Sequence, residues 1–262
     1  MSSQVDIKAR LNQCLKALQL TAIKVCYEEE AKTAAQESLS YEGYLLRVAE
    51  RECEKRRERR IARKLGESRL PLEKTLGAFE LARLPRKVVQ QVRTLLQGAF
   101  LDRRENVLVF GNPGSGKTHL VCAIGQELVH QDRNIYYTPC SLLVQELLLA
   151  KREFSLPRAL KRLGRFEGIV IDDIGYVQQS RDEMEVLFTL LAERYERGSV
   201  LITSNLPFSQ WEKIFKDPVT AAAAIDRLVH HSVIVELNLP SYRMEAAKRA
   251  KEKGGESKYR KE

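Results

Sequence analysis

The chain has 262 residues, 44% of them hydrophobic and 30% charged, so it is long and apolar enough to bury a full-sized core. Its formal net charge is +9, from 44 basic and 35 acidic side chains. No apolar run approaches the roughly 20 residues that a membrane span requires, and no secretory signal is apparent, so we expect a cytoplasmic protein with no membrane partner.

Basic residues concentrate in two segments. Residues 47–64 carry nine Lys/Arg against four Asp/Glu, and residues 241–262 carry eight against four, which gives +5 and +4 and leaves the remainder neutral. Lys and Arg supply most contacts to phosphates, so this distribution favours a protein that binds nucleic acid. The alternative is a solvated helix and a disordered tail.

Helical patterns dominate the first 66 residues. Apolar positions recur over residues 6–36 at the spacing of one or two amphipathic helices. A further helix is predicted from residue 41 to about residue 65, with Ser40 as its N-cap and its arginines facing water or phosphate. We expect residues 1–66 to form a helical domain that contacts a protein partner or DNA. The candidate DNA contacts are Arg56, Arg57, Arg59, Arg60, Arg63 and Lys64.

Gly, Ser and Pro residues interrupt the helical pattern next, which predicts a linker over residues 67–80. Strands and helices then alternate through residues 81–240. The strands are predicted at 107–110, 134–138, 168–171, 200–203 and 232–237, and the helices at 117–130, 141–152 and 182–197. This alternation predicts an α/β domain with a parallel sheet flanked by helices. Residues 241–262 are expected to form a basic, disordered tail.

The first site motif is GNPGSGKT, residues 111–118, between a predicted buried strand and a predicted helix. Its glycines allow a turn whose N–H groups surround phosphate oxygens. Lys117 is expected to reach the β- and γ-phosphates of ATP, and Thr118 to bind Mg²⁺. A purely structural glycine turn is the alternative, and the flanking strand and helix argue against it. The expected nucleotide contacts are Gly111, Asn112, Pro113, Gly114, Ser115, Gly116, Lys117, Thr118 and His119.

Two acidic residues end the predicted strand in GIVIDDIG, at the edge where parallel sheets bind ligands. Successive side chains of a strand point to opposite faces, so the acids should have different roles. We expect Asp172 to bind Mg²⁺ and Asp173 to polarise the attacking water. Surface acids that close a strand are the alternative. The next strand ends in Ser204 and Asn205, whose amide could hold that water, although Asn-Leu-Pro also forms ordinary turns.

These motifs, in this order, resemble those of AAA+ ATPases, and the chain is similar to the IstB-like transposition helper ATPases, relatives of DnaC-type helicase loaders. The resemblance runs from about Leu15 to Arg243 and includes LSYEGYLLRVAERECEKRRERRIARKL, KTLGAFEL, DRLVHHSVIVEL and PSYR. It implies an AAA+ P-loop core without a C-terminal lid domain and Asn205 as a sensor residue. It also implies that Arg227 completes the site of a neighbouring subunit. Arg243 is expected near nucleotide or DNA, and a surface role is the alternative for both arginines.

The sequence therefore predicts an ATPase that assembles as a homo-oligomer on duplex DNA, engages a transposase, and uses ATP hydrolysis to reset the complex. A helicase loader is an alternative that the core motifs do not separate from this one. A second alternative is a nucleotide-bound, non-hydrolysing DNA-binding scaffold, which the intact Lys117, Asp172 and Asp173 disfavour. A small-metabolite kinase is also disfavoured, because no acceptor-binding lid is apparent.

Overall fold

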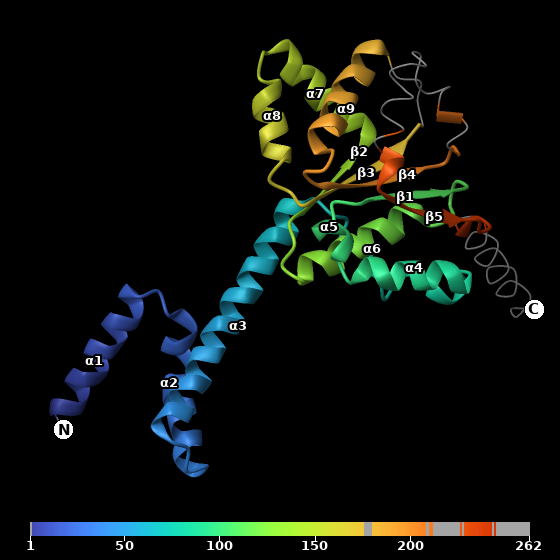
Figure 1. Ribbon diagram of the computed structural model, residues 1–262. Coiled ribbons are helices and arrows are strands. Elements are labelled where there is room, and N and C mark those ends of the chain that lie inside the picture. Colours follow the sequence, from blue (N-terminus) through green and yellow to red (C-terminus); the bar gives the residue numbers. More distant parts are fainter. Residues whose placement is uncertain are drawn as a thin grey trace, which may run out of the picture. The chain divides into compact units, whose positions relative to one another are not determined.

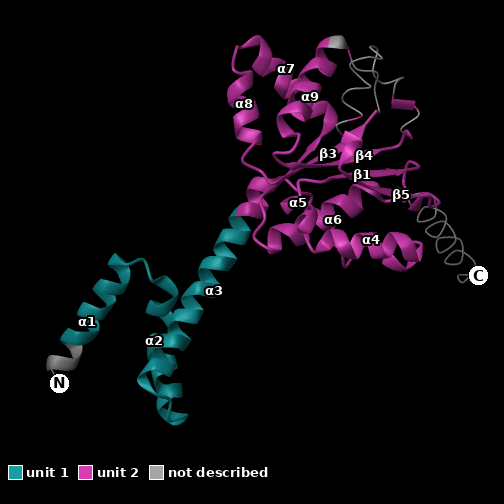
Figure 2. Ribbon diagram, in the orientation of Figure 1, with its two compact units in different colours: residues 1–63 teal, residues 64–262 magenta. Residues whose placement is uncertain are grey.

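The computed structural model describes residues 2–175, 180–207, 210–211, 226, 228–242 and 244 (Figure 1). The chain divides into two compact units, residues 1–63 (unit 1) and residues 64–262 (unit 2), shown in Figure 2. The sequence pattern places the domain boundary at residue 66, a few residues later. None of the helices in the described ranges is long and apolar enough to cross a membrane.

Unit 1 is built from α1 (Ser2–Ala17), α2 (Thr21–Gln36) and most of α3 (Tyr41–Ser68). The predicted N-cap of α3 is present, because the Ser40 hydroxyl accepts a hydrogen bond of 3.1 Å from the N–H of Gly43. The helix continues three residues beyond the expected end near residue 65. In unit 2, Leu65 packs against the hydrophobic core and the Ser68 hydroxyl donates to the Leu65 carbonyl at 2.7 Å, which supports this last turn.

A buried acid on α3 caps the start of α2. Glu52 is 4% exposed, and its Oε2 accepts hydrogen bonds from the N–H groups of Ala22 and Ile23 at 2.7 and 3.2 Å. Its other oxygen accepts from Arg56 Nε at 2.9 Å. Residue Leu20, which precedes α2, provides no side-chain cap of its own. Glu52 therefore satisfies two N–H groups that the helix itself leaves unpaired.

The sheet of unit 2 has the strand order β2-β3-β4-β1-β5, and every neighbouring pair is parallel. Its strands are β1 (Asn106–Gly111), β2 (Ile135–Pro139), β3 (Gly168–Ile174), β4 (Ser199–Ser204) and β5 (Ser232–Leu237). The predicted parallel α/β core is therefore confirmed. This order places β4 between β1 and β3, so the carboxyl ends of these three strands share one stretch of the sheet edge.

Helices cover both faces of the sheet (Figure 1). One face carries α4 (Arg86–Leu96), α5 (Ala99–Asp102) and α6 (Lys117–His130), and the other carries α7 (Cys140–Arg152), α8 (Leu156–Leu163) and α9 (Arg181–Arg194). Successive side chains of β1 point to opposite faces of the sheet. Val107 and Val109 belong to the hydrophobic cluster shared with α4, α5 and α6, while Leu108 and Phe110 belong to the cluster shared with α7, α8 and α9. A 3₁₀ turn, Leu81–Arg83, precedes α4.

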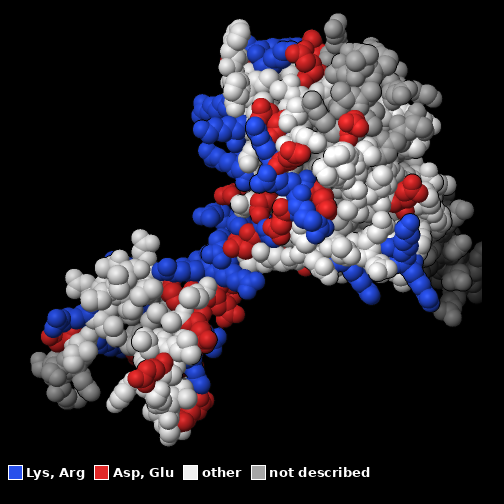
Figure 3. Space-filling view, viewed as in Figure 1, with Lys and Arg blue, Asp and Glu red and all other residues white. Residues whose placement is uncertain are grey.

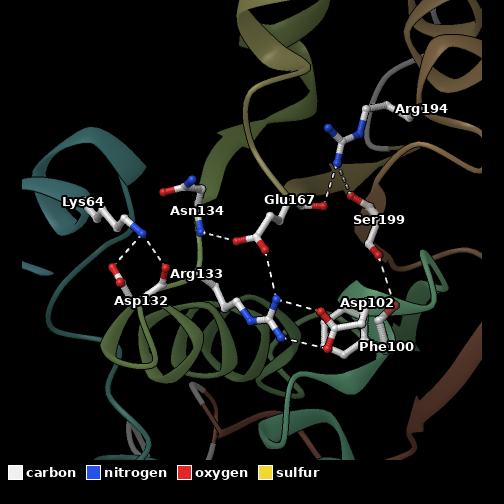
Figure 4. Close-up of polar contacts among 9 residues, drawn as sticks. All are labelled: Lys64, Phe100, Asp102, Asp132, Arg133, Asn134, Glu167, Arg194 and Ser199. Atoms are coloured by element: carbon white, nitrogen blue, oxygen red, sulfur yellow. Dashed lines mark hydrogen bonds and ion pairs between the residues drawn. The ribbon is translucent and has the colours of Figure 1, made fainter. Parts of the chain in front are cut away.

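Charged side chains, one of them buried, connect the amino ends of the strands (Figure 4). The Arg133 guanidinium donates to both oxygens of Asp102 at 2.7 and 2.8 Å and to Glu167 at 3.0 Å. Arg194 is 5% exposed and donates to the carbonyls of Glu167 and Ser199 at 2.8 and 2.9 Å. Burial lowers the pKa of Arg194 to about 10, so it stays charged at neutral pH. This network fixes the strands from the edge opposite the P-loop.

Candidate active site

The GNPGSGKT segment forms the connection between β1, which ends at Gly111, and α6, which begins at Lys117. Gly114 and Gly116 have φ values of 81° and 95°, in the left-handed region that favours glycine. A Cβ atom on Gly111 would lie 2.5 Å from the carbonyl oxygen of Leu237. The glycines are therefore required by backbone conformation and by close contact, and the loop ends at the N-terminus of a long helix, where anions bind.

Lys117 lies across the inside of this loop. Its side chain is largely buried, and its Nζ donates to the carbonyl oxygens of Gly111 and Asn112 at 2.8 and 3.0 Å. The Ser115 hydroxyl is buried and has no hydrogen-bond partner within the described part of the chain. A buried polar group of this kind needs a partner, and a phosphate oxygen would supply one. The loop thus fits the triphosphate of a nucleotide.

Three hydroxyl groups hold the carboxylate of Asp172, which is 7% exposed at the end of β3. Its Oδ1 accepts from Thr118 Oγ1 at 2.9 Å and from Thr203 Oγ1 at 2.6 Å, while Oδ2 accepts from the Tyr137 hydroxyl at 3.0 Å. Burial raises the pKa of Tyr137, and the charge and hydrogen bond of Asp172 raise it further, so the phenol remains a donor. The donors come from α6, β4 and β2.

The pairing of Thr118 with Asp172 fits Mg²⁺. A hydroxyl and a carboxylate are hard oxygen ligands, and Mg²⁺ commonly takes one or two protein oxygens together with phosphate oxygens and water. Both side chains reach the same place, with the loop of residues 111–116 leading directly into Thr118. These residues would hold the ion beside the bound phosphates.

Asp173 differs from its neighbour because the strand is irregular here. The register of β3 against β4 shifts between Ile171 and Ile174, and Asp173 has a φ of 64°. Its side chain is exposed, while its N–H donates to Thr203 Oγ1 at 2.8 Å. The two acids are therefore separated as expected, although by a bulge and not by simple alternation. Thr203 links the two, because it accepts from Asp173 and donates to Asp172.

The end of β4 supplies a turn and an amide. The Ser204 hydroxyl lies 3.0 Å from the carbonyl oxygen of Ile174 and accepts from the N–H of Leu206 at 3.1 Å, so Ser204 shapes the turn. The Asn205 Oδ1 atom is buried without a hydrogen-bond partner among the described residues. An unsatisfied amide oxygen at this edge of the sheet is available to a water molecule or ligand.

A cavity of about 360 Å³ adjoins the loop and is lined by two segments outside the strand ends. Phe79 and Arg83 come from the stretch before α4, and Leu239 and Tyr242 follow β5. The Arg83 guanidinium lies 5.2 Å from the centre of the Tyr242 ring, and the Tyr242 N–H donates to the Gly114 carbonyl at 3.0 Å. The aromatic walls and their position fit the base and sugar of a nucleotide.

His119 belongs to the same wall. Its Nε2 lies 2.9 Å from the Thr75 carbonyl oxygen, and its ring packs edge-on against Phe79 at 5.3 Å between centroids. A larger cavity, about 590 Å³, lies at the amino ends of the strands near Asn106, Arg194 and His231. We place the site at the smaller cavity, because the larger one is remote from every phosphate-binding group.

The remaining predicted residues are two arginines near the C-terminus and the basic residues of α3. Arg227 and Arg243 lie outside the described residues. Several of the basic residues proposed to contact DNA already have partners within the chain. Arg56 pairs with Glu52 at 2.9 Å, Arg59 donates to Thr21 at 2.8 Å, and Lys64 pairs with Asp132 at 2.7 Å (Figure 4).

Sequence reasoning missed the residues that support the site. Thr203 lies within the predicted strand VLITSN, where a threonine next to Ser204 was a readable sign. Phe79 and Tyr242 occur in the segments KTLGAFEL and PSYR, which were noted only as resemblances. Nothing in the sequence around Tyr137 indicated a role in the site, because its contact with Asp172 depends on β2 lying beside β3.

Comparisons with known proteins agree with this geometry. A family model described as IstB-like ATP binding protein matches residues 13–250. The chain is 40% identical over 249 residues to a Sinorhizobium fredii protein named as an insertion sequence ATP-binding protein (y4iQ/y4nD/y4sD), covering 95% of this chain and 84% of that relative. It is 35% identical to an insertion sequence IS21 ATP-binding protein of Pseudomonas aeruginosa, covering 92% and 91%.

Solved structures show the fold. The chain is similar to DnaI, with a TM-score of 0.54 and 20% identity over 64% of this chain and 94% of that one. It is also similar to AMPPCP-bound DnaA from Aquifex aeolicus, with a TM-score of 0.55 and 19% identity over 71% and 56%. At this identity the likeness confirms the AAA+ fold alone.

Proposed function

The chain belongs to the family of IstB-like ATP-binding proteins, and from this premise we propose that it hydrolyses ATP as a helper ATPase in DNA transposition. The names of its relatives, insertion sequence ATP-binding proteins, support the link to transposition. The resemblance to helicase loaders supports only the shared fold.

The observation that carries the proposal is the contact between Thr118 and Asp172, 2.9 Å, at the mouth of the phosphate-binding loop. It joins the two halves of a nucleotide hydrolysis site, and the exposed Asp173 follows immediately on the same strand. A loop that only held a nucleotide would not need a second, solvent-facing acid held by its own backbone bond to Thr203.

In the proposed mechanism, the loop N–H groups and Lys117 bind the β- and γ-phosphates, and Lys117 exchanges its loop carbonyl contacts for phosphate oxygens. Thr118 and Asp172 would hold Mg²⁺, and the ion would neutralise phosphate charge. Asp173 accepts a proton from the attacking water, and the Asn205 amide orients that water. Arg227 of a neighbouring subunit stabilises charge in the transition state.

The finer parts of the proposal concern assembly. We propose that ATP assembles the chain into a homo-oligomer on duplex DNA, that the N-terminal helices engage a transposase, and that hydrolysis releases the complex. Completion of the site by Arg227 in trans makes hydrolysis depend on this assembly. The net charge of +9 supports binding to a polyanion.

Two substitutions separate binding of ATP from its hydrolysis. We expect Lys117→Ala to abolish binding of a fluorescent ATP analogue, because the phosphates lose their cation. Asp173→Asn should retain binding but lose phosphate release by about 10²-fold to 10⁴-fold, the usual contribution of a general base. Asp182→Asn, an exposed acid in the first turn of α9, is the matched control and should behave as wild type. Phosphate release by Asp173→Asn at the wild-type rate would contradict the proposed role.

A further inference from the structure

The turn between α7 and α8 presents an aromatic side chain to solvent. Phe154 is 95% exposed and has a φ of 56°, a left-handed conformation that is unusual for a bulky residue. The turn is held by backbone hydrogen bonds from Phe154 to the Lys151 carbonyl at 3.2 Å and from Ser155 to the Ala150 carbonyl at 2.8 Å. The ring is therefore displayed by a hydrogen-bonded turn. The same left-handed conformation follows other helices of this chain, at Gln19, Arg69 and Glu196, so the ring is held outward by an ordinary helix C-terminus.

Positive charge surrounds this ring. Residues 151–165 contain six Lys/Arg and one Asp/Glu, a net charge of +5 that equals the charge of residues 47–64. In Figure 3, Lys and Arg side chains gather along the edge of unit 2 that α8 occupies in Figure 1. Four of the six cations are exposed and make no ion pair with any residue that the structure describes: Arg152, Arg158, Lys161 and Arg165.

The remaining two cations have acidic partners. Lys151 pairs with Glu185 of α9 at 2.8 Å, and Arg162 pairs with Glu146 of α7. These pairs leave the other four cations with Glu153 as the one remaining acid of the segment, a net charge of +3. A net positive charge of this kind is what attracts a polyanion.

The packing of α8 fixes the direction of these charges. Leu156, Leu160 and Leu163 lie on the side of α8 that packs into the hydrophobic cluster above the sheet. Arg158 and Lys161 lie on the exposed side of the same helix, three residues apart. Arg158 and Lys161 thus project from one helix at a fixed spacing, as contacts along a phosphate backbone require, and Arg152 and Arg165 lie on either side of that helix in the sequence.

We propose that Arg152, Phe154, Arg158, Lys161 and Arg165, here termed the α7–α8 surface, contact duplex DNA. The cations bind backbone phosphates, and the Phe154 ring reaches the bases as an apolar wedge in the minor groove. This inference rests on the proposed function and assigns it a contact surface on the ATPase unit. It differs from the sequence-based prediction, which placed the DNA contacts on α3, where Arg56, Arg59 and Lys64 are already engaged.

The test measures binding of the full chain to a fluorescent duplex of about 30 base pairs, with a non-hydrolysable ATP analogue, across a salt series. Each phosphate contact contributes about 0.9 to the slope of log affinity against log salt. We expect Arg158→Ala/Lys161→Ala/Arg165→Ala to reduce that slope by roughly 3 and to weaken binding more than about tenfold at low salt. Phe154→Ala should weaken binding by about tenfold at every salt concentration and leave the slope unchanged.

The matched control removes the same charge from the other face of the sheet. Arg86→Ala/Lys87→Ala/Arg93→Ala alters three exposed cations of α4 and should leave the slope as in wild type. Phe154→Trp should keep the wild-type affinity, and its fluorescence should be quenched by duplex DNA. All variants should bind the fluorescent ATP analogue normally, which shows that they are folded.

The possible failures are distinguishable. The inference is overturned if the wild-type chain binds duplex DNA and the α7–α8 variants bind it equally well. It is also overturned if the α4 control weakens binding as much as those variants do. Either result leaves the proposed function standing. A wild-type chain that binds no duplex DNA would contradict the proposed function itself.

Discussion

At the scale of single residues, the Asp172 carboxylate owes its position to hydroxyl groups on three different elements. Thr118 and Thr203 bind one oxygen, and Tyr137 binds the other. Only the first of these hydroxyls belongs to the phosphate-binding motif. Tyr137 and Thr203 are positioning residues, because they hold the acid in the orientation in which its oxygen meets Thr118.

Removal of the Tyr137 hydroxyl should weaken binding of Mg²⁺ at the proposed site. Tyr137→Phe removes the hydrogen bond to one oxygen of the Asp172 carboxylate. A hydrogen bond to a charged group contributes about 1.5 to 3 kcal/mol, so the orientation of the carboxylate becomes less strongly fixed. We expect the Mg²⁺ concentration for half-maximal ATP hydrolysis to rise about 3-fold to 10-fold, with less change at saturating Mg²⁺. The same shift should appear in the Mg²⁺ dependence of fluorescent ATP binding, which does not require turnover.

The neighbouring tyrosine provides the control for this substitution. The Tyr136 hydroxyl is buried but has no hydrogen-bond partner in the described ranges, so Tyr136→Phe should leave the Mg²⁺ dependence unchanged. The raised pKa of Tyr137 means that its contribution is present below the ordinary tyrosine value of about 10 and is lost only at higher pH. The effect of Tyr137→Phe should therefore be equal at about pH 7 and pH 9. A Tyr137→Phe effect that vanishes at pH 9 would contradict the role of the Tyr137 hydroxyl as a donor to Asp172.

At the scale of elements, Glu52 stabilises the start of α2 from the neighbouring helix α3. Burial acts to raise the pKa of Glu52, but hydrogen bonds from Arg56, Ala22 and Ile23 outweigh burial and lower it below its ordinary value. A lowered pKa means that the ionised form is favoured by folding. The stabilisation is then complete above the ordinary pKa of 4.5 and is lost as the pH falls through the folded value.

Glu52→Gln should loosen α2. A helix cap contributes about 1 kcal/mol, so we expect amide hydrogen exchange in the first turns of α2 to accelerate about 5-fold or more. In the wild-type chain, the same amides should lose protection as the pH falls below about 4.5, after correction for the intrinsic exchange rate. Glu54→Gln, an exposed acid on α3, is the control and should not change exchange in α2. Equal exchange in both variants would contradict the capping role.

The sequence predicted those parts of the structure that depend on local pattern. The strands at 107–110 and 168–171 and the helix at 117–130 follow from apolar runs and the loop motif, and all are present. Three helices were missed. The spacing of Val88, Val92 and Leu95 in α4 was readable, and so was the spacing of Leu156, Leu160 and Leu163 in α8, whereas α5 spans only four residues and carries little periodicity.

In the candidate site, too, the features that depend on local sequence pattern were predictable and those that depend on tertiary contacts were not. The contact between Thr118 and Asp172 was predictable, because each residue ends its own motif at the same edge of a parallel sheet. The bulge at Asp173 was not, because it arises from the pairing of β3 with β4. The contact of Tyr137 and the walls formed by Phe79 and Tyr242 depend equally on tertiary neighbours. A single sequence shows which residues can bind a nucleotide more readily than it shows what holds them.

At the scale of the whole molecule, our proposals assign the positive charge and the nucleotide site to one function. The chain combines a nucleotide site with a net charge of +9, and the cations of the α7–α8 surface belong to the same unit as the P-loop. Net charge counted over long segments concealed this surface, because acidic residues elsewhere in unit 2 balance it. We therefore expect DNA to act on the ATPase unit directly.

The most direct test of the proposed function is ATP turnover per chain across a protein dilution series, with and without duplex DNA. We expect the rate of phosphate release per chain to rise with protein concentration and to rise further with duplex DNA, because a neighbouring subunit completes the site on DNA. Lys117→Ala should release no phosphate under any condition. A wild-type rate per chain that is the same at every concentration and unaffected by duplex DNA would contradict assembly-dependent hydrolysis on DNA.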